Sequence, residues 1–241
     1  MVFNLLTPEE CIIRDQAIAY VREHRDKIIH EIAGDKKYIG NPALSIFMAG
    51  SPGAGKTETS KVLLSLFDNT PLQNNIIRLD PDEIRGLLPQ YQGGNAHIFQ
   101  QPIAIATNYI FNHVIKENMH ILLDGTFSNY DYAYQNVTKS LKKNRVIIIM
   151  YSYVDPISAW AFTQAREAKE GRKITKQVFI DALFGSLETI KKIQSTFGNK
   201  VAVYVFIRDY TKDERKAFYN IDNIDKYIKL SYSRKELENN I

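Results

Sequence analysis

Short apolar runs alternate with longer segments of helical periodicity through the middle of the chain. Five runs have the nearly continuous apolar character of buried strands, and they lie at 43–49, 75–79, 120–123, 145–154 and 200–207. Segments with helical spacing lie at 56–67, 81–88, 96–118, 130–142, 156–169 and 175–196. Strands of this kind, joined by helical crossovers, predict an α/β fold whose parallel sheet is covered by helices on both faces.

The two ends of the chain depart from this alternation. Residues 8–33 have the spacing of one amphipathic helix, which Thr7 can cap and Gly34 can end. The tail from residue 211 is polar with scattered aromatic residues, and we interpret it as helical turns packed on the body. The pattern predicts a single domain over 1–241, made of an N-terminal helical segment (1–40), a core (41–210) and a C-terminal helical tail (211–241).

The composition changes this picture little, but it narrows the functional classes. An apolar fraction of 44% and a charged fraction of 24% are those of an ordinary globular protein. The net charge of +4 comes without a long Lys/Arg block, which argues against a dedicated nucleic-acid surface. Cys11 is the single cysteine, so an intramolecular disulfide and a thiolate metal cage are excluded. No apolar stretch reaches the roughly 18 residues of a membrane span, and we expect a cytoplasmic protein.

The stretch GSPGAGKT at 50–57 is the most informative motif in the chain. It has the form G-x-x-x-x-G-K-T and stands between a predicted strand and a predicted helix, which is the context that a P-loop requires. Backbone N–H groups of such a loop bind phosphates, the lysine reaches the β- and γ-phosphates, and the threonine hydroxyl coordinates Mg²⁺. We therefore predict that ATP or GTP binds with Mg²⁺ at Gly50, Ser51, Pro52, Gly53, Ala54, Gly55, Lys56, Thr57 and Glu58.

Acidic residues follow two of the neighbouring strands. Asp80 has the position of a helix N-cap, with Pro81 and Glu83 after it in the first turn. The cap does not require Asp82, which could complement the helix dipole or act in catalysis. Asp124 follows another strand, where it could bind Mg²⁺ like a Walker-B aspartate or contact the substrate. These acids are expected at the carboxyl ends of the strands, near the P-loop.

Three further stretches accompany the P-loop, and they read RLDPDEIR, LLDGTFSN and AWAFTQAREAKEGRKITKQ. Together with GSPGAGKT, and over roughly residues 40–200, they resemble the zeta-toxin family. Those proteins are P-loop kinases that phosphorylate the 3′-hydroxyl of the amino sugar in UDP-N-acetylglucosamine. The resemblance implies a P-loop kinase-like three-layer sandwich with a mostly parallel sheet of five or six strands. It also implies a nucleotide sugar as substrate and an antitoxin protein as a candidate partner.

The resemblance also implies roles for individual residues. Asp82 would be the base that accepts the proton of the substrate hydroxyl, and Asp124 with Thr126 would orient the acceptor. Lys56, Arg166 and Arg172 would stabilise charge on the transferred phosphoryl group, and Thr57 would hold Mg²⁺. The residues that carry these roles or flank them are Lys56, Thr57, Asp82, Arg85, Asp124, Thr126, Ser128, Arg166 and Arg172.

One position departs from the family pattern. The family has arginine where this chain has Ser128, and the loss of a guanidinium removes a strong anion contact. Arg85 could supply a replacement charge. The departure leaves the acceptor open, and a nucleic-acid end, a nucleoside or an antibiotic are alternatives to a nucleotide sugar.

A third hypothesis is a nucleotide-binding regulatory module without acceptor chemistry. Asp82 and the two arginines argue against it, although Arg166 and Arg172 could also be surface residues paired with Glu167 or Glu170.

Overall fold

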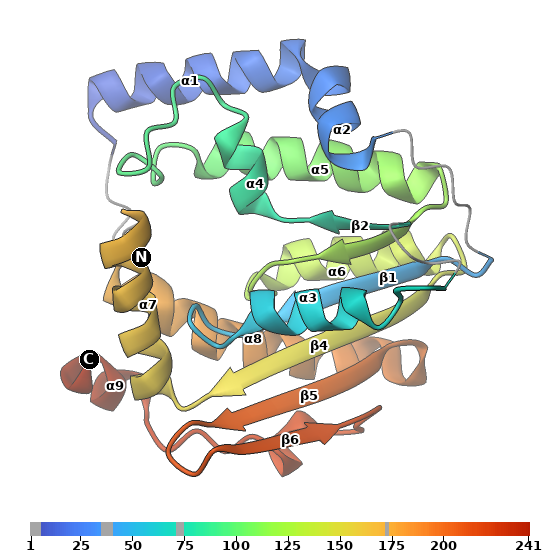
Figure 1. Cartoon of the computed structure of the whole chain (residues 1–241), viewed down its shortest axis with the longest axis vertical. Helices are drawn as coiled ribbons and strands as arrows, with labels where there is room; N and C mark the ends of the chain where they lie inside the picture. The colour runs from blue at the N-terminus through green and yellow to red at the C-terminus, as the bar shows by residue number, and fades with distance from the viewer. Residues whose placement is uncertain (1–5, 35–40, 71–74, 172–173) are drawn as a thin grey trace.

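The protein is built around a single six-stranded sheet with the strand order β2-β3-β1-β4-β5-β6 (Figure 1). The computed structural model describes residues 6–34, 41–70, 75–171 and 174–241. All neighbouring strands pair in parallel except β5 and β6, which are antiparallel. The strands are β1 (Leu44–Ala49), β2 (Ile76–Leu79), β3 (His120–Leu123), β4 (Val146–Val154), β5 (Ala202–Asp209) and β6 (Glu214–Phe218). This architecture confirms the predicted mostly parallel α/β sandwich.

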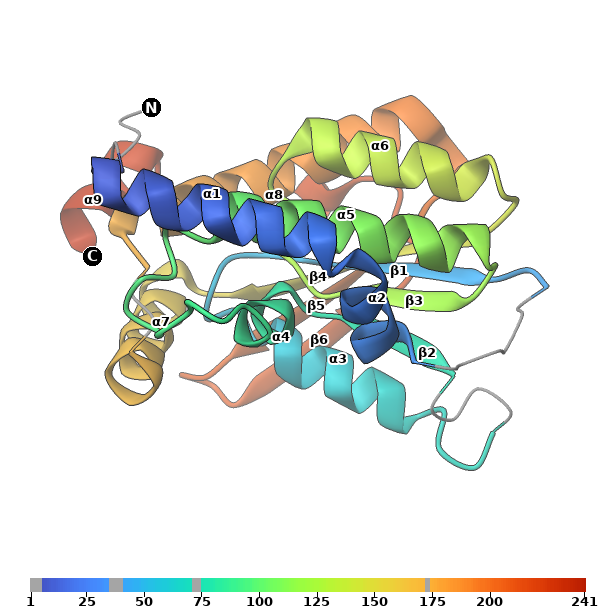
Figure 2. The same ribbon diagram turned by 90° about the horizontal axis from the view of Figure 1, so that it is seen from above.

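Helices cover the two faces of the sheet unequally. Figure 2 shows α5, α6 and α8 on one side of the sheet and α3 on the other, with α1 lying outside α5. The helices are α1 (Pro8–Glu23), α2 (Arg25–Ala33), α3 (Lys56–Ser65), α4 (Pro81–Gly86), α5 (Gln100–Lys116), α6 (Tyr130–Leu141), α7 (Pro156–Glu170), α8 (Lys176–Phe197) and α9 (Arg234–Asn240). Within the described ranges, none of the helices combines the length and the apolar character needed to cross a membrane.

The alternation of side chains along each strand divides the core in two. Residues such as Phe47, Ile121 and Val203 point to the face covered by α5 and α8, where they join the largest buried cluster. Their neighbours Met48 and Leu122 point the other way and form a smaller cluster with α3. Because the cluster under α3 is small, it leaves part of this face of the sheet uncovered toward β4, β5 and β6.

The N-terminal segment forms two helices, where the sequence predicted one. The break is at His24, whose φ of −99° and ψ of 23° are not helical. The imidazole of His24 stacks on Tyr20 with 4.0 Å between ring centroids, and its Nδ1 lies 3.1 Å from the carbonyl oxygen of Tyr20. The break changes the direction of the chain, so that α2 packs on both α5 and β2. The predicted ends are confirmed, with Thr7 in a capping box and Gly34 after the last residue of α2.

The helical interpretation of the tail is wrong for its first part. Residues 214–218 form β6, which pairs with β5. A tight turn precedes it, in which Asp209 Oδ1 accepts hydrogen bonds from the backbone N–H and the hydroxyl of Thr211, and Asp213 has a φ of 50°. The turn sends the chain back along β5, and backbone pairing then outweighs the low strand propensity of a charged segment. Helical turns in the tail are confined, among the described residues, to 224–226 and α9.

Candidate active site

The register of the sheet brings the carboxyl ends of three strands to one edge. Leu79 at the end of β2 is paired with Leu123 at the end of β3, and β1 lies next to β3. Asp80, Asp124 and the P-loop at 50–57 follow these strands directly. The carboxyl edge of a parallel sheet is where such folds bind their ligands. The structure therefore brings the predicted phosphate loop and the predicted acids into one region.

The P-loop packs so closely on its surroundings that glycine is required at two positions. Gly50 has a φ of +130°, and a Cβ atom there would lie 2.4 Å from the carbonyl oxygen of Ser152 on β4. Gly53 has a φ of +71°, and a Cβ atom there would lie 2.0 Å from the carbonyl oxygen of Ala159 on α7. Gly55, with a φ of +77°, turns the chain into α3. These left-handed residues form the kind of backbone concavity that binds anions.

Lys56 opens α3 and its ammonium group lies across the loop. The Nζ atom donates hydrogen bonds to the carbonyl oxygens of Gly50 (3.1 Å) and Ser51 (2.6 Å). Thr57 follows in the first turn of the helix, where it is partly buried. The loop, the lysine and the helix N-terminus together fit a triphosphate. A Mg²⁺ ion that accompanies a triphosphate takes most of its ligands from phosphate and water, so Thr57 alone fits the protein's share.

Arg78 joins the acids beside the P-loop, a position that was not predicted from the sequence. Its Nη2 lies 2.6 Å from Asp80 Oδ2 and 2.6 Å from Asp124 Oδ2, and its Nη1 lies 2.6 Å from Glu83 Oε1. The Arg78 side chain is only 14% exposed. Ser60 on α3 also donates to Asp124 Oδ2, at 3.2 Å. The one available signal was a charged residue inside the apolar strand sequence IIRL.

Burial and charge act against each other in this cluster. Burial lowers the pKa of the Arg78 guanidinium, but the hydrogen bond to Asp124 and the charges of Asp80, Asp124 and Glu83 outweigh it and raise that pKa. Burial also raises the pKa of Asp80, and the hydrogen bond from the Asp82 N–H together with the charge of Arg78 offsets this only in part. The cluster is therefore a partly desolvated group in which one guanidinium is shared among three carboxyl groups.

Asp82 lies in the first turn of α4 and forms an ion pair with Arg85. Asp80 accepts the Asp82 N–H at 2.9 Å, which confirms Asp80 as the N-cap of this helix. Asp82 Oδ1 is 2.7 Å from Arg85 Nη1. The Arg85 side chain is 9% exposed, and its guanidinium lies 5.7 Å from the ring centroid of Tyr91. Arg85 is therefore held against the Asp82 carboxylate.

The loop after β3 connects the P-loop to the helices behind the sheet. The carbonyl oxygen of Thr126 accepts the Gly50 N–H at 3.1 Å, and the carbonyl oxygen of Ser128 accepts the Thr189 hydroxyl at 3.3 Å. The two hydroxyl groups of Thr126 and Ser128 are 2.8 Å apart. Where the resembling family has an arginine, this chain thus has a pair of neutral hydroxyl groups fixed beside the P-loop.

Helix α7 contacts the P-loop and carries Arg166 on the same face as the contact. Ala159, which touches Gly53, is followed at i+4 by Thr163 and at i+7 by Arg166, so the three residues share one face of the helix. The Arg166 side chain is exposed. Gly171, with a φ of 71°, ends the helix. The predicted partner Arg172 lies outside the described residues.

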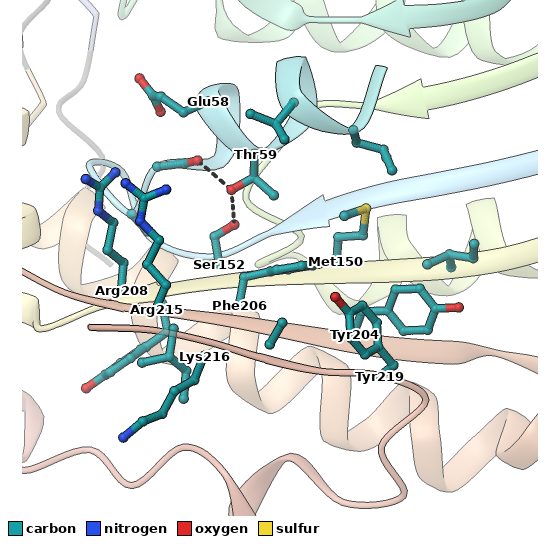
Figure 3. Close-up of a pocket in the computed structure, with 18 of the residues that line it drawn as sticks. Glu58, Thr59, Met150, Ser152, Tyr204, Phe206, Arg208, Arg215, Lys216 and Tyr219 are labelled. Carbon is teal, nitrogen blue, oxygen red and sulfur yellow. Dashed lines mark hydrogen bonds between the residues drawn. The ribbon is translucent and has the colours of Figure 1, made fainter. Parts of the chain in front are cut away.

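A cleft of about 430 Å³ adjoins the P-loop on the other side of α3, between this helix and β4, β5 and β6. Figure 3 shows Arg208 and Arg215 at the end of the cleft where α3 begins, and Tyr204 with Tyr219 at the far end. The Arg208 guanidinium lies 4.2 Å from the ring centroid of Tyr210, which in turn contacts Phe162 of α7. The lining is otherwise mostly apolar and includes Ile46, Val62, Leu63, Leu66, Phe67, Ile148, Met150 and Phe206.

Solved structures with low sequence identity share this fold. A chain from the PezAT chromosomal toxin-antitoxin system of the human pathogen Streptococcus pneumoniae aligns with a TM-score of 0.57 and 15% identity, covering 98% of this chain and 88% of that one. A chain of the AvrRxo1-ORF1:-ORF2 structure with ATP aligns with a TM-score of 0.58 and 12% identity, covering 92% of this chain and 72% of that one. At these identities the matches establish the fold alone.

Sequence comparisons give the family. A search of curated proteins found no match. The family model described as zeta toxin matches residues 15–224, which include the P-loop, both acidic strand ends and α7. The chain therefore belongs to the zeta toxin family and has its P-loop kinase-like fold.

Proposed function

We propose that the protein is a kinase that transfers the γ-phosphate of ATP or GTP to a sugar hydroxyl, of UDP-N-acetylglucosamine or a related nucleotide sugar. The observation that carries this proposal is the junction of the P-loop with the acidic strand ends. Ser60, one turn into the P-loop helix, bonds to Asp124, and Arg78 links Asp124 to Asp80. A phosphate-binding loop and a set of carboxylates in one place suit phosphoryl transfer to an alcohol.

On the phosphate side, the backbone N–H groups of 53–57 would bind the triphosphate. Lys56 would exchange its bonds to the Gly50 and Ser51 carbonyl oxygens for phosphate oxygens. Mg²⁺, held by Thr57, would neutralise charge on the phosphates. Arg166, on the helix face that contacts the loop, and Arg172 would add positive charge near the phosphoryl group.

On the acceptor side, Asp82 would accept the hydroxyl proton. Its ion pair with Arg85 supports this role because it fixes the orientation of the carboxylate. Asp124, Thr126 and Ser128 would bind the acceptor. The transition state of phosphoryl transfer is loose, so a carboxylate that orients the hydroxyl and takes its proton late is a sufficient base.

The nucleoside would occupy the mouth of the cleft beside α3. Gly55, Glu58 and Thr59 line this mouth next to the phosphate loop, and Tyr210 offers an exposed ring there. An apolar cleft with an aromatic ring is suited to a flat base.

The test is phosphate transfer from ATP and GTP to a panel of nucleotide sugars, with product detection by ³¹P NMR and mass spectrometry. Asp82→Asn is expected to lower turnover by about 100- to 10,000-fold, the range typical of a lost general base. Asp131→Asn is the matched control, because Asp131 also lies in the first turn of a helix and could act only on its dipole. Equal turnover of the wild type and Asp82→Asn would remove Asp82 from the mechanism.

A second acceptor class is supported by the hydroxyl pair. Thr126 and Ser128 present neutral groups where an arginine would select an anion. A nucleoside or an antibiotic hydroxyl would suit these groups, so both belong in the panel, together with nucleic-acid ends. Transfer to one of these and to no nucleotide sugar would replace the first proposal.

We also propose an antitoxin protein as partner, because one of the aligned structures comes from a toxin-antitoxin system. A neighbouring gene product that binds the chain and suppresses its growth inhibition on co-expression would support this. A chain that has no effect on growth when expressed alone would contradict it.

A further inference from the structure

Arg78 makes contacts with three different elements of the active site. It lies on β2, its Nη2 bonds to Asp124 at the end of β3, and its Nε lies 3.4 Å from Ser60 Oγ on α3. It also bonds to Asp80, the N-cap of α4. These three elements carry the phosphate loop, the acceptor-binding acid and the helix of the proposed base.

A largely buried arginine in this strand costs desolvation free energy, which its ion pairs have to offset. The neighbouring residues of β2 are Ile76, Ile77 and Leu79, and an apolar residue at position 78 would avoid the desolvation of a charge. The guanidinium is planar, with its N–H groups in a rigid fork, so its bonds fix directions as well as distances. One nitrogen, Nη2, lies 2.6 Å from a carboxylate oxygen of Asp80 and 2.6 Å from one of Asp124. Arg78 therefore bridges these two acids and fixes the orientation of their carboxylates relative to each other.

We propose that Arg78 is a positioning residue of the active site. It holds Asp124, which contacts the acceptor, at a fixed distance from α4, which carries the base Asp82. This inference rests on the proposed function for those two roles. The same contacts engage Asp124 Oδ2 within the protein, because this oxygen accepts from both Arg78 Nη2 and Ser60 Oγ.

The first test measures the kinetic constants for the acceptor and for ATP separately. Arg78→Met is expected to lower kcat/KM for the acceptor about 100-fold, as a misplaced group does, and to leave KM for ATP within about two-fold. Arg78→Lys keeps the charge but loses the fork, so it should recover part of the loss. A merely structural role would change both KM values together and would give no recovery specific to the acceptor.

Arg145 provides the matched control. It is also a buried arginine, 4% exposed, and it donates to Ser45 Oγ at 2.7 Å and to the carbonyl oxygens of Leu44 and Met119 at 2.6 Å. These partners lie at the opposite ends of the strands, far along the sheet from the P-loop. Arg145→Met should lower the unfolding temperature and leave kcat and both KM values of the folded protein unchanged.

A second test does not depend on turnover. The urea midpoints of Arg78→Met, Asp124→Asn and the double variant form a double-mutant cycle. We expect Asp124→Asn to shift the midpoint less in the Arg78→Met background than in the wild type. If the wild type phosphorylates no acceptor, the proposed function fails while the cycle still reports on the contact. Additive midpoints, or equal changes in the two KM values, would overturn the role of Arg78.

Discussion

The two flanks of α3 offer opposite surfaces to a ligand. Toward β2 and β3, charged side chains are largely buried and already bonded to one another, with Arg78 2.6 Å from both Asp80 and Asp124. Toward β4, β5 and β6, the cleft of about 430 Å³ is lined mostly by aromatic and aliphatic side chains. The hydrogen bonds that Figure 3 marks there lie near the mouth, where the Thr59 hydroxyl donates to the Gly55 carbonyl oxygen and accepts from the Ser152 hydroxyl.

This difference determines which substrate the protein can select strictly. A site of fixed polar groups rejects an analogue that leaves one of them unpaired by large factors, often 10,000-fold or more. An apolar cleft discriminates between similar shapes by roughly 10- to 200-fold only. We call the side of α3 toward β2 and β3 the polar flank. If the acceptor binds there and the nucleoside binds in the cleft, the choice of acceptor is strict and the choice between ATP and GTP is loose.

The largest effect is expected at the P-loop, which borders both flanks of α3. Gly53→Ala would place a Cβ atom 2.0 Å from the Ala159 carbonyl oxygen, in a backbone conformation with a φ of +71°. The strain and the overpacking together should cost about 2–5 kcal/mol of unfolding free energy. Displacement of the loop from α7 should also abolish detectable ATP binding. Thermal unfolding and calorimetric titration with MgATP measure the two effects.

Gly93→Ala is the control for this change. Gly93 has a similar φ of +77°, but a Cβ atom there meets nothing within 4 Å. This variant should lose only the roughly 1–2 kcal/mol of the left-handed conformation and should bind ATP normally. Normal ATP binding by Gly53→Ala would mean that the loop does not depend on its contact with α7.

Tyr210→Ala should weaken nucleoside binding in the cleft without affecting the polar flank. The Tyr210 ring is 42% exposed at the mouth and supports the guanidinium of Arg208. Loss of an aromatic surface under a base should raise KM for ATP and GTP alike, by about tenfold, and leave KM for the acceptor unchanged. Tyr219→Ala removes a ring at the far end of the cleft and should change neither KM. An equal effect of the two variants would place the nucleoside deeper in the cleft.

Much of the fold could be predicted because its signals are local. The P-loop, the apolar strands and the helix ends are each encoded within a few residues. Thr175, for example, accepts the Val178 N–H at the start of α8, and Gly171 ends α7. The N-terminal break at His24 was not predicted, because a histidine in a helical pattern carries no signal for a break.

The parts that could not be predicted depend on contacts distant in sequence. The β6 strand reads ERKAF, and only its pairing with β5 makes a strand of it. Arg78 was visible as a charge in an apolar strand, but its partner Asp124 is 46 positions away. The roles of Asp82 and Arg166 came from the family resemblance, and they stay predictions.

Ser60→Ala tests how far the polar flank depends on a single neutral group. The hydroxyl is fully buried and bonds to the Thr57 carbonyl oxygen at 2.9 Å and to Asp124 at 3.2 Å. Its loss should lower the unfolding free energy by about 1–2 kcal/mol, because the buried Oδ2 atom of Asp124 loses one of its hydrogen-bond donors. Urea unfolding measures this, with the exposed Ser65→Ala as control. Equal stability of the two variants would show that water replaces the Ser60 hydroxyl.

Asp80→Asn tests whether the charges of the polar flank raise or lower the free energy of unfolding. Its effect should be the smallest. The pKa of Asp80 is raised, chiefly by burial, so the native state holds this proton more tightly than the unfolded state. The contribution of Asp80 to stability should then fall as the pH rises from its ordinary pKa of 3.8 through the raised native value. Asparagine keeps the N-cap without titrating.

The stability of the wild type relative to Asp80→Asn should therefore decrease across this acidic window and stay level above it. Unfolding in urea at a series of pH values measures this difference. The opposite slope would mean that Arg78 lowers the pKa of Asp80 more than burial raises it, so that attraction outweighs desolvation. In that case the polar flank would stabilise the fold, and its arrangement would need no catalytic reason.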